Sequence, residues 1–298
     1  MLPTIKLMTV LTLTNTHGDL AEIDLEAGAA ITKLILNKED IIKYPLKTDD
    51  PQKGYPSALL FPFPNRIKDG RYSFGDKDYS LGINDADSSN AIHGLIAFQT
   101  FELKEQTKSK ATLVYVYEGE NEGYPFPFEF SITYALKKGK LDIKVQAENT
   151  GETPMPFGFG WHPYFGFSGK AIGEMEVEVP RRFKMELSDR YIPTGEKEEM
   201  PAEVIGLKNT ILDNVFTLHE PTPLTEITLK CENKKLIVSQ ESSKNKLVYF
   251  VLYTPPTRDC IAIEPQTCNT NAFNSGEGLQ VLKPGTRANF QMSVRVEA

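Results

Sequence analysis

The chain has 298 residues, of which 40% are hydrophobic and 10% aromatic, so it is long enough to bury a large core. Its 33 basic and 40 acidic residues give a formal net charge of −7, which disfavours polyanions and excludes nucleic acid as the expected partner. No stretch approaches the roughly 18 uninterrupted apolar residues that a membrane helix needs, so we expect no membrane partner either.

The first predicted element is a β-strand within residues 1–15. The segment is mildly apolar but is interrupted by a proline, a lysine and several threonines. It lacks the basic start, the continuous apolar run and the small-residue cleavage site of a signal peptide. We therefore expect a cytoplasmic protein.

An apolar approach, LLFPF, leads into the polar pair Asn65 and Arg66. The planar fork of donors on an arginine suits hydroxyls or carboxylates, although a structural ion pair with a neighbouring acid fits the same position. A β-hairpin is predicted directly afterwards, over 72–81, with the sequence GDKD at or near its turn.

Two histidines stand apart from polar turns. His93 lies between a polar loop and an apolar run, whereas His162 lies among aromatic residues and glycines in FGFGWHPYF. Histidine is the natural proton carrier near neutral pH. Taken alone, each fits a hydrogen-bonded structural histidine as well as a catalyst. Alternation of apolar and polar residues predicts the strands between them, at 111–119, 128–136 and 140–150.

The alternation continues through the C-terminal half and predicts strands at 175–179, 225–232, 235–241, 247–254, 260–266 and 289–297. Helical periodicity is weak throughout, and only 201–207 is expected to form a short turn of helix. Asp213 lies in the apolar run NTILDNVFTL, where an aspartate either forms a turn or accepts hydrogen bonds from hydroxyls.

Glu264 follows an apolar run and precedes Pro265, which predicts that the strand ends there. Desolvation at the end of a buried strand would raise the pKa of the carboxyl group and suit a general base. The alternative is an ordinary glutamate at the surface. The three cysteines are odd in number and lack CxxC spacing, so we expect reduced thiols and no metal site.

Short strands bounded by Gly, Asn, Asp and Pro predict an all-β, mostly antiparallel fold of sheets packed on sheets. No repeat or low-complexity linker interrupts the chain, so we expect a single domain over residues 1–298. The two histidines, the glutamate, the arginine and the aspartate together suit a sugar site. Aromatic faces stack on the C–H side of a pyranose, polar groups bind its hydroxyls, and an acid and a base open and close a hemiacetal.

Four segments resemble the aldose 1-epimerase (galactose mutarotase) family: FPFPNRIKDGRYSFGDKDYSL, NAIHGL, GFGWHPYF and IAIEPQTCNTNAFN. A fifth, LDNVF, resembles the aspartate segment of that family more weakly. The segments run in family order from residue 59 to 274, so the resemblance covers most of the chain.

The resemblance implies the galactose mutarotase-like fold, a large twisted β-supersandwich. It also implies an isomerase that interconverts the α and β anomers of a free aldose such as glucose or galactose, without a cofactor. Glu264 would take the proton from the anomeric hydroxyl, His162 would protonate the ring oxygen, and His93 would assist near that oxygen or bind the sugar. The substrate-binding residues would be Asn65, Arg66 and Asp213. The aromatic residues expected to hold the His162 ring are Trp161, Tyr164 and Phe165.

Two departures from the family leave the sugar open: the segment around Asp213 is short, and Pro163 follows His162 where several mutarotases carry serine. A hexose-6-phosphate 1-epimerase would use the same acid and base with extra arginines for the phosphate. The arginines available for that role are Arg71, Arg181, Arg182 and Arg190. A non-catalytic carbohydrate-binding protein on the same fold is the other alternative, although binding alone needs no matched acid and base. The sequence does not choose between a monomer and a homodimer.

Overall fold

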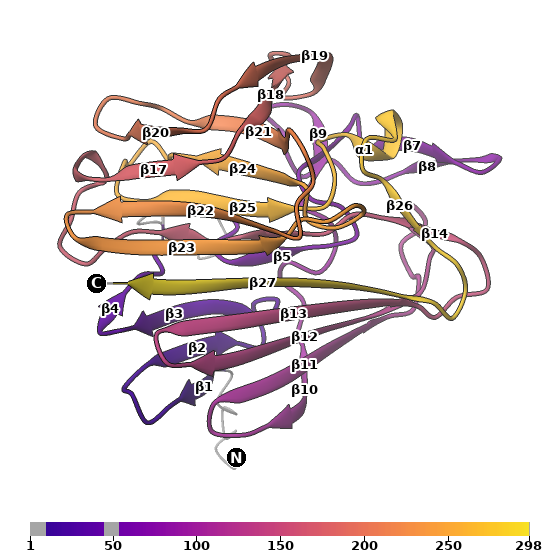
Figure 1. The fold of residues 1–298 in the computed structure, drawn as a ribbon. Coiled ribbons are helices and arrows are strands. Elements are labelled where there is room, and N and C mark those ends of the chain that lie inside the picture. The colour runs from indigo at the N-terminus through magenta and orange to yellow at the C-terminus, as the bar shows by residue number, and fades with distance from the viewer. Residues whose placement is uncertain (1–9, 45–53, 298) are drawn as a thin grey trace, which may run out of the picture.

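The computed structural model describes residues 10–44 and 54–297, and antiparallel strands dominate it (Figure 1). The largest sheet has nine strands in the order β10 (Glu102–Gln106), β11 (Lys110–Tyr117), β12 (Phe128–Lys137), β13 (Lys140–Asn149), β27 (Arg287–Glu297), β23 (Lys234–Glu241), β22 (Leu224–Cys231), β17 (Glu176–Val179) and β20 (Glu203–Gly206). The C-terminal strand β27 therefore lies in the centre of this sheet, between strands from distant parts of the chain.

The second sheet has eight strands and carries three of the six predicted site residues, namely His162, Asp213 and Glu264. Seven of them follow the order β19 (Pro193–Met200), β18 (Arg182–Leu187), β21 (Asp213–Leu218), β24 (Tyr249–Tyr253), β25 (Ile261–Gln266), β15 (Gly160–His162) and β5 (Ala58–Leu60). The eighth, β16 (Tyr164–Phe165), also pairs with β25.

Smaller elements surround the two large sheets. A four-stranded sheet comprises β1 (Val10–Thr14), β2 (Leu20–Asp24), β3 (Ala30–Leu36) and β4 (Glu39–Asp40). The two-stranded pairs are β6 (Arg66–Lys68) with β9 (Asn90–Ile92), β7 (Arg71–Phe74) with β8 (Lys77–Ser80), and β14 (Met155–Phe157) with β26 (Gln280–Leu282). A 3-10 helix spans Ile172–Glu174, and α1 (Ala272–Ser275) lies beside the β7–β8 hairpin at one end of the sheets (Figure 1).

Both large sheets contribute to the same apolar core, because side chains alternate across each strand. On β25, Ile261 and Ile263 are fully buried in that core. The ring of Phe159, just before β15, stacks on Phe290 of β27 with 5.6 Å between centroids. The opposite face of the eight-stranded sheet is therefore the one that carries polar groups.

The strand predictions are confirmed, including the 72–81 hairpin, whose turn lies at Gly75-Asp76 between β7 and β8. The N-terminal strand is confirmed at Val10–Thr14, and residues 1–9 lie outside the described part of the chain. The prediction of a helical turn at 201–207 is wrong, because Glu203–Gly206 form the edge strand β20 and Ile205 pairs with Val177. Four residues contain too few repeats to separate the two periodicities, and main-chain pairing decides the outcome.

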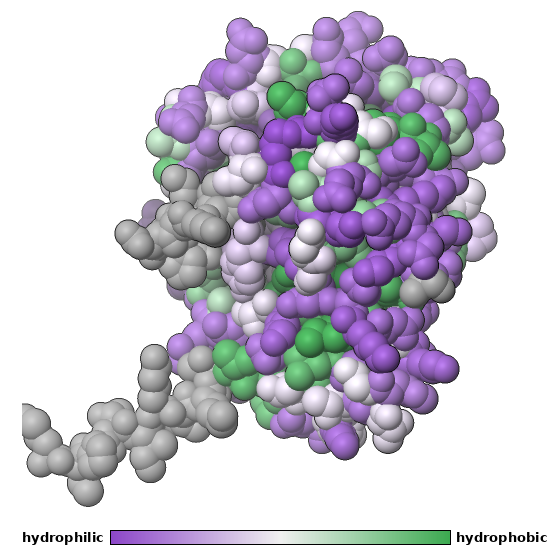
Figure 2. Space-filling model, turned by 90° about the vertical axis from the view of Figure 1, so that its left-hand side faces the viewer, coloured by the Kyte–Doolittle hydropathy of each residue, from purple (hydrophilic) through white to green (hydrophobic). Residues whose placement is uncertain are grey.

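One face of the surface is mainly hydrophilic, with apolar residues in small separate groups (Figure 2). No helix among the described residues is both long and apolar enough to cross a membrane.

Candidate functional site

The candidate site lies on the face of the eight-stranded sheet that points away from the main core. On β25, Ala262 and Glu264 alternate with the core residues of that strand. On β21, Asp213 shares its face with Val215, which belongs to a small apolar cluster separate from the main core. Tyr253 of β24 pairs with Asp213 and packs against that same small cluster. The register thus places two carboxylates on one face.

Glu264 lies inside β25 and not at its end, which corrects the prediction from Pro265. The ladder with β24 continues past it, with Phe250 opposite Pro265 and Tyr249 opposite Gln266. On the other side of β25, the pairing is interrupted between β15 and β16. The proline has no N–H to donate, and this break is where the sheet tolerates it.

The carboxylate of Glu264 contacts the imidazole of His162 across the β15–β25 boundary. Glu264 Oε1 lies 3.3 Å from His162 Nε2, and the two residues are only 2% and 6% exposed. Gln266 Nε2 donates a hydrogen bond of 3.2 Å to the other oxygen, Glu264 Oε2. The sequence pattern predicted both titratable groups near a site, and the structure brings them into direct contact.

Burial controls the protonation of this pair. Desolvation raises the pKa of Glu264 to about 8, and the hydrogen bond from Gln266 opposes that rise. Desolvation lowers the pKa of His162 to about 4. Between these two values the pair binds one proton, which either partner can hold.

His93 lies beside His162, with 5.3 Å between the ring centroids. The backbone N–H of Asn65 donates to His93 Nδ1 at 3.3 Å, and the backbone N–H of His93 donates to the Asn65 carbonyl at 2.9 Å. Because Nδ1 accepts a hydrogen bond, a neutral His93 bears its proton on Nε2. Burial, helped by the charges of His162 and Arg66, lowers the pKa of His93 well below its ordinary value. His93 is therefore a neutral donor.

The local backbone that presents His93 is strained. Asn65 and His93 have φ values of 55° and 64°, in the left-handed region that most side chains avoid. Gly94 follows with φ of 74°, and a Cβ there would lie 2.3 Å from the carbonyl oxygen of Phe61. The His-Gly step of the sequence is thus a packing requirement as well as a family motif, since only glycine fits at Gly94.

Arg66 is held from several directions. Its Nε donates to Asp85 Oδ2 at 2.6 Å, and its Nη1 donates to Asn65 Oδ1 at 3.3 Å. Its guanidinium carbon lies 4.5 Å from the centroid of the Tyr191 ring. The positive charge of Arg66 lowers the pKa values of both Asp213 and Glu264, against the larger rise that burial causes in each. The structural ion pair posed as one alternative for Arg66 is therefore present, with Asp85 as the neighbouring acid.

Asp213 is the first residue of β21 and not part of a turn. The residue is exposed to solvent, yet desolvation by the surrounding protein raises its pKa, against the opposing charge of Arg66. The charge of Asp213 raises the pKa of the buried Glu264, so the exposed Asp213 carboxylate suits a hydrogen-bond acceptor close to the buried pair.

Several residues around the histidines were not identified from the sequence. The ring of Tyr55 packs on His93 with 4.5 Å between centroids, and Tyr191 and Gln266 make the contacts given above. Tyr164 packs on His162 at 4.9 Å, as predicted. The prediction for Trp161 and Phe165 is not supported, because strand alternation turns both into the main core, where they contact each other.

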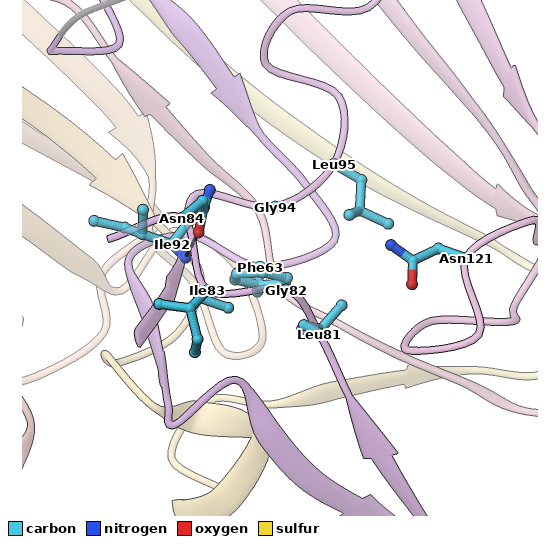
Figure 3. Close-up of a pocket in the computed structure, with 10 residues that line it drawn as sticks. Phe63, Leu81, Gly82, Ile83, Asn84, Ile92, Gly94, Leu95 and Asn121 are labelled. Carbon is cyan, nitrogen blue, oxygen red and sulfur yellow. Dashed lines mark hydrogen bonds between the residues drawn. The ribbon is translucent and has the colours of Figure 1, made fainter. Parts of the chain in front are cut away.

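A cavity of about 230 Å³ lies next to the His93 segment (Figure 3). Ile92 and Gly94 line it, together with Phe63, Leu81 and Asn84. None of the six predicted site residues lines this cavity, so the groups that can move a proton lie elsewhere.

The observed architecture is an antiparallel β-supersandwich with a buried carboxylate–imidazole pair on one sheet face. The family model for aldose 1-epimerase matches residues 9–295. An uncharacterized protein of Escherichia coli K12, YihR, is 27% identical over 273 residues, which are 90% of this chain and 87% of that protein. The chain belongs to the aldose 1-epimerase family, and the resemblance seen in its motifs is confirmed.

Solved structures show the same fold. A galactose mutarotase-like protein from Clostridium acetobutylicum superposes with a TM-score of 0.83 at 22% identity, covering 94% of this chain and 93% of that one. The GalM/aldose epimerase homologue from C. elegans also gives 0.83, at 18% identity and with 97% and 98% coverage. The predicted galactose mutarotase-like fold is therefore confirmed.

Proposed function

We propose that this protein is an aldose 1-epimerase that interconverts the α and β anomers of a free aldose such as glucose or galactose. The observation that carries the proposal is the buried contact between Glu264 and His162, at 3.3 Å. A base and an acid in contact with each other can reach the anomeric hydroxyl and the ring oxygen of one pyranose, because both oxygens are bonded to the same carbon.

The proposed reaction keeps one proton on the pair throughout. With the carboxylate ionised and the imidazole protonated, Glu264 takes the proton of the anomeric hydroxyl while His162 donates a proton to the ring oxygen. The C1–ring oxygen bond breaks, and the hydroxyl becomes the carbonyl of the open-chain aldehyde. The pair is then a neutral acid and a neutral imidazole, the form that burial favours. Rotation about C1–C2 and reversal of both transfers close the other anomer.

The remaining residues receive binding and positioning roles in this proposal. His93 donates through Nε2, either to the ring oxygen or to a neighbouring hydroxyl. Arg66 and Asp213 hold other hydroxyls of the sugar, close to the catalytic pair. Asn65 acts through its neighbours, since its backbone orients His93 and its side chain orients Arg66.

The ion pairs of the described arginines favour an uncharged sugar over a phosphorylated one as the substrate. Three of those considered for a phosphate already donate to carboxylates: Arg181 to Glu199, Arg182 to Glu203 and Arg190 to Asp69. Recruiting any of them would break a protein ion pair. Glucose and glucose 6-phosphate, compared as substrates, separate the two possibilities.

The experiment that tests the function follows anomer exchange by polarimetry or NMR for the wild type and for Glu264→Gln. We expect the variant to lose about 10²- to 10⁴-fold in kcat, because it retains the shape of the carboxyl group but not its basicity. Glu178→Gln, a change on the exposed side of β17, is the matched control and should retain wild-type activity. Full activity in Glu264→Gln would refute the assignment of the base, and saturable sugar binding without any rate enhancement in the wild type would favour a binding protein.

A further inference from the structure

The segment between β18 and β19, residues 188–192, reaches from the edge of the eight-stranded sheet to the candidate site. We call it the 188–192 arm. Its Tyr191 ring lies against the Arg66 guanidinium at 4.5 Å, and Tyr191 is 39% exposed. We propose that Tyr191 is a positioning residue for substrate binding, which holds the Arg66 guanidinium in the plane required by the sugar hydroxyls; this inference rests on the proposed function.

Arg190 fixes the arm to the loop that directly precedes β9 and to the turn between β6 and β7. Its Nε donates to the Ser88 carbonyl at 2.9 Å, and its Nη2 donates to Asp69 Oδ1 at 2.6 Å and to the Ser89 carbonyl at 2.9 Å. An arginine with its planar fork of donors engaged in this way is immobilised at little further entropic cost. The arm is therefore attached to the site and does not hang free in solvent.

The backbone of the arm is strained at Tyr191. Its φ is 59°, a left-handed value that is a true outlier for a bulky aromatic residue. The backbone N–H of Tyr191 donates to the Ser188 carbonyl at 2.8 Å, and the N–H of Ser188 donates to the Ile192 carbonyl at 2.9 Å. This tight turn aims the ring inward. Strain of this kind persists where the surroundings require it, and here the surrounding group is Arg66.

Arg66 is consequently restrained in three ways. Asp85 and Asn65 bind it in the plane of the guanidinium, and Tyr191 covers one face. Among the described residues, no acceptor is bonded to its Nη2. These remaining N–H groups are the ones that a polyol can use.

The test compares wild type with Tyr191→Leu, Tyr191→Phe and Arg190→Ala by anomer-exchange kinetics. Loss of a cation–π contact predicts that Tyr191→Leu raises KM by about 2- to 30-fold and leaves kcat within about threefold. Tyr191→Phe should reverse most of that rise, since it restores the aromatic face, and Arg190→Ala should raise KM in the same direction. Tyr115→Leu, a change to a half-buried tyrosine of β11 in the other sheet, is the matched control.

A second readout does not depend on turnover. The ¹H–¹⁵N resonance of Arg66 Nε should shift in Tyr191→Leu, because the ring current is lost, and should stay in place in Tyr115→Leu. An unchanged resonance, or an unchanged KM in Tyr191→Leu, would overturn the inference while the proposed function stands. A wild-type protein that accelerates no anomer exchange would instead refute the proposed function, whatever the Arg66 resonance does.

Discussion

The protonation state of the Glu264–His162 pair makes the proposed reaction depend on pH. Burial favours the neutral form of each group, so the pair holds one proton between about pH 4 and about pH 8. The reactive form, with an ionised carboxylate and a protonated imidazole, has the same number of protons as the resting form. It is therefore available only within this window.

We expect kcat/KM for anomer exchange to be bell-shaped with pH. It should fall below about pH 4, where His162 adds a second proton to the pair, and above about pH 8, where Glu264 loses the shared proton. NMR exchange measurements at constant ionic strength, corrected for spontaneous mutarotation, give the profile. A rate independent of pH between 5 and 10 would contradict the proposed pair.

Gln266→Leu tests whether Glu264 sets the alkaline limb of that profile. The hydrogen bond from Gln266 favours the ionised carboxylate and lowers the pKa of Glu264, so its removal raises that pKa further. The alkaline limb should move to higher pH, and the acid limb should remain near its wild-type position.

The titratable residues of the candidate site could be predicted from the sequence, but the aromatic residues that contact them could not. Glu264, His162 and His93 stand in apolar frames that are visible in the chain itself. Tyr55 and Tyr191 reach the site from loops, where side-chain direction depends on positive φ values that local sequence does not encode. Contacts of this kind are set by tertiary packing.

At the element scale, the conformation of one glycine controls the placement of a histidine. Gly94 directly follows His93, and the Phe61 carbonyl that faces Gly94 also accepts the N–H of Leu95 at 2.8 Å. The strand–loop segment from β9 onward is thus held tightly against the β5 side of the sheet. Any side chain at Gly94 has to push this contact apart.

We expect Gly94→Ala to lower the free energy of unfolding by about 2–4 kcal/mol, since it combines an unfavourable φ with a backbone clash. Gly75→Ala is the matched control, because Gly75 has a similar φ of 61° but no atom within 4 Å of the position that a new methyl group would take. That change should cost only about 1–2 kcal/mol. Urea denaturation measures both, and equal costs would show that the approach to Phe61 is not limiting.

Period-two alternation predicted the long strands well because each has one face in the core and one outside it. β12 and β13 are clear examples, with regular alternation of buried and less buried positions. The short elements failed for physical reasons. β20 is an edge strand of four residues, and Pro265 is accommodated inside β25 because the neighbouring ladder is interrupted beside it. Neither pairing can be inferred from the local pattern.

At the scale of the whole molecule, the buried ionisable pair of the site lowers the stability of the folded protein. The two large sheets share a core that extends from Leu11 to Val296, and the site occupies the other face of one sheet. Placing an ionisable pair there costs free energy whenever the carboxylate is charged without a compensating proton. Function and stability should therefore oppose each other at Glu264.

The free-energy cost of the buried Glu264 carboxylate depends on pH. Burial raises the pKa of Glu264 from 4.5 to about 8, so the folded state binds more protons than the unfolded state between these values. Stability from this group is complete below about pH 4.5 and is lost progressively as pH rises through about 8. Glu264→Gln cannot ionise. We expect its free energy of unfolding to match that of the wild type near pH 4.5 and to exceed it near pH 9 by about 2–5 kcal/mol.

Urea unfolding at both pH values, followed by the fluorescence of the single tryptophan, Trp161, measures this difference, since that side chain is fully buried. Glu178→Gln, at an exposed position of β17, removes only a surface ion pair with Lys230 and should track the wild type to within about 1 kcal/mol at both pH values. A Glu264→Gln protein that is no more stable than the wild type at pH 9 would mean that the ionised carboxylate is already compensated in the fold. In that case, the inactive variant would have lost activity without gaining stability, and the opposition between function and stability at Glu264 would not hold.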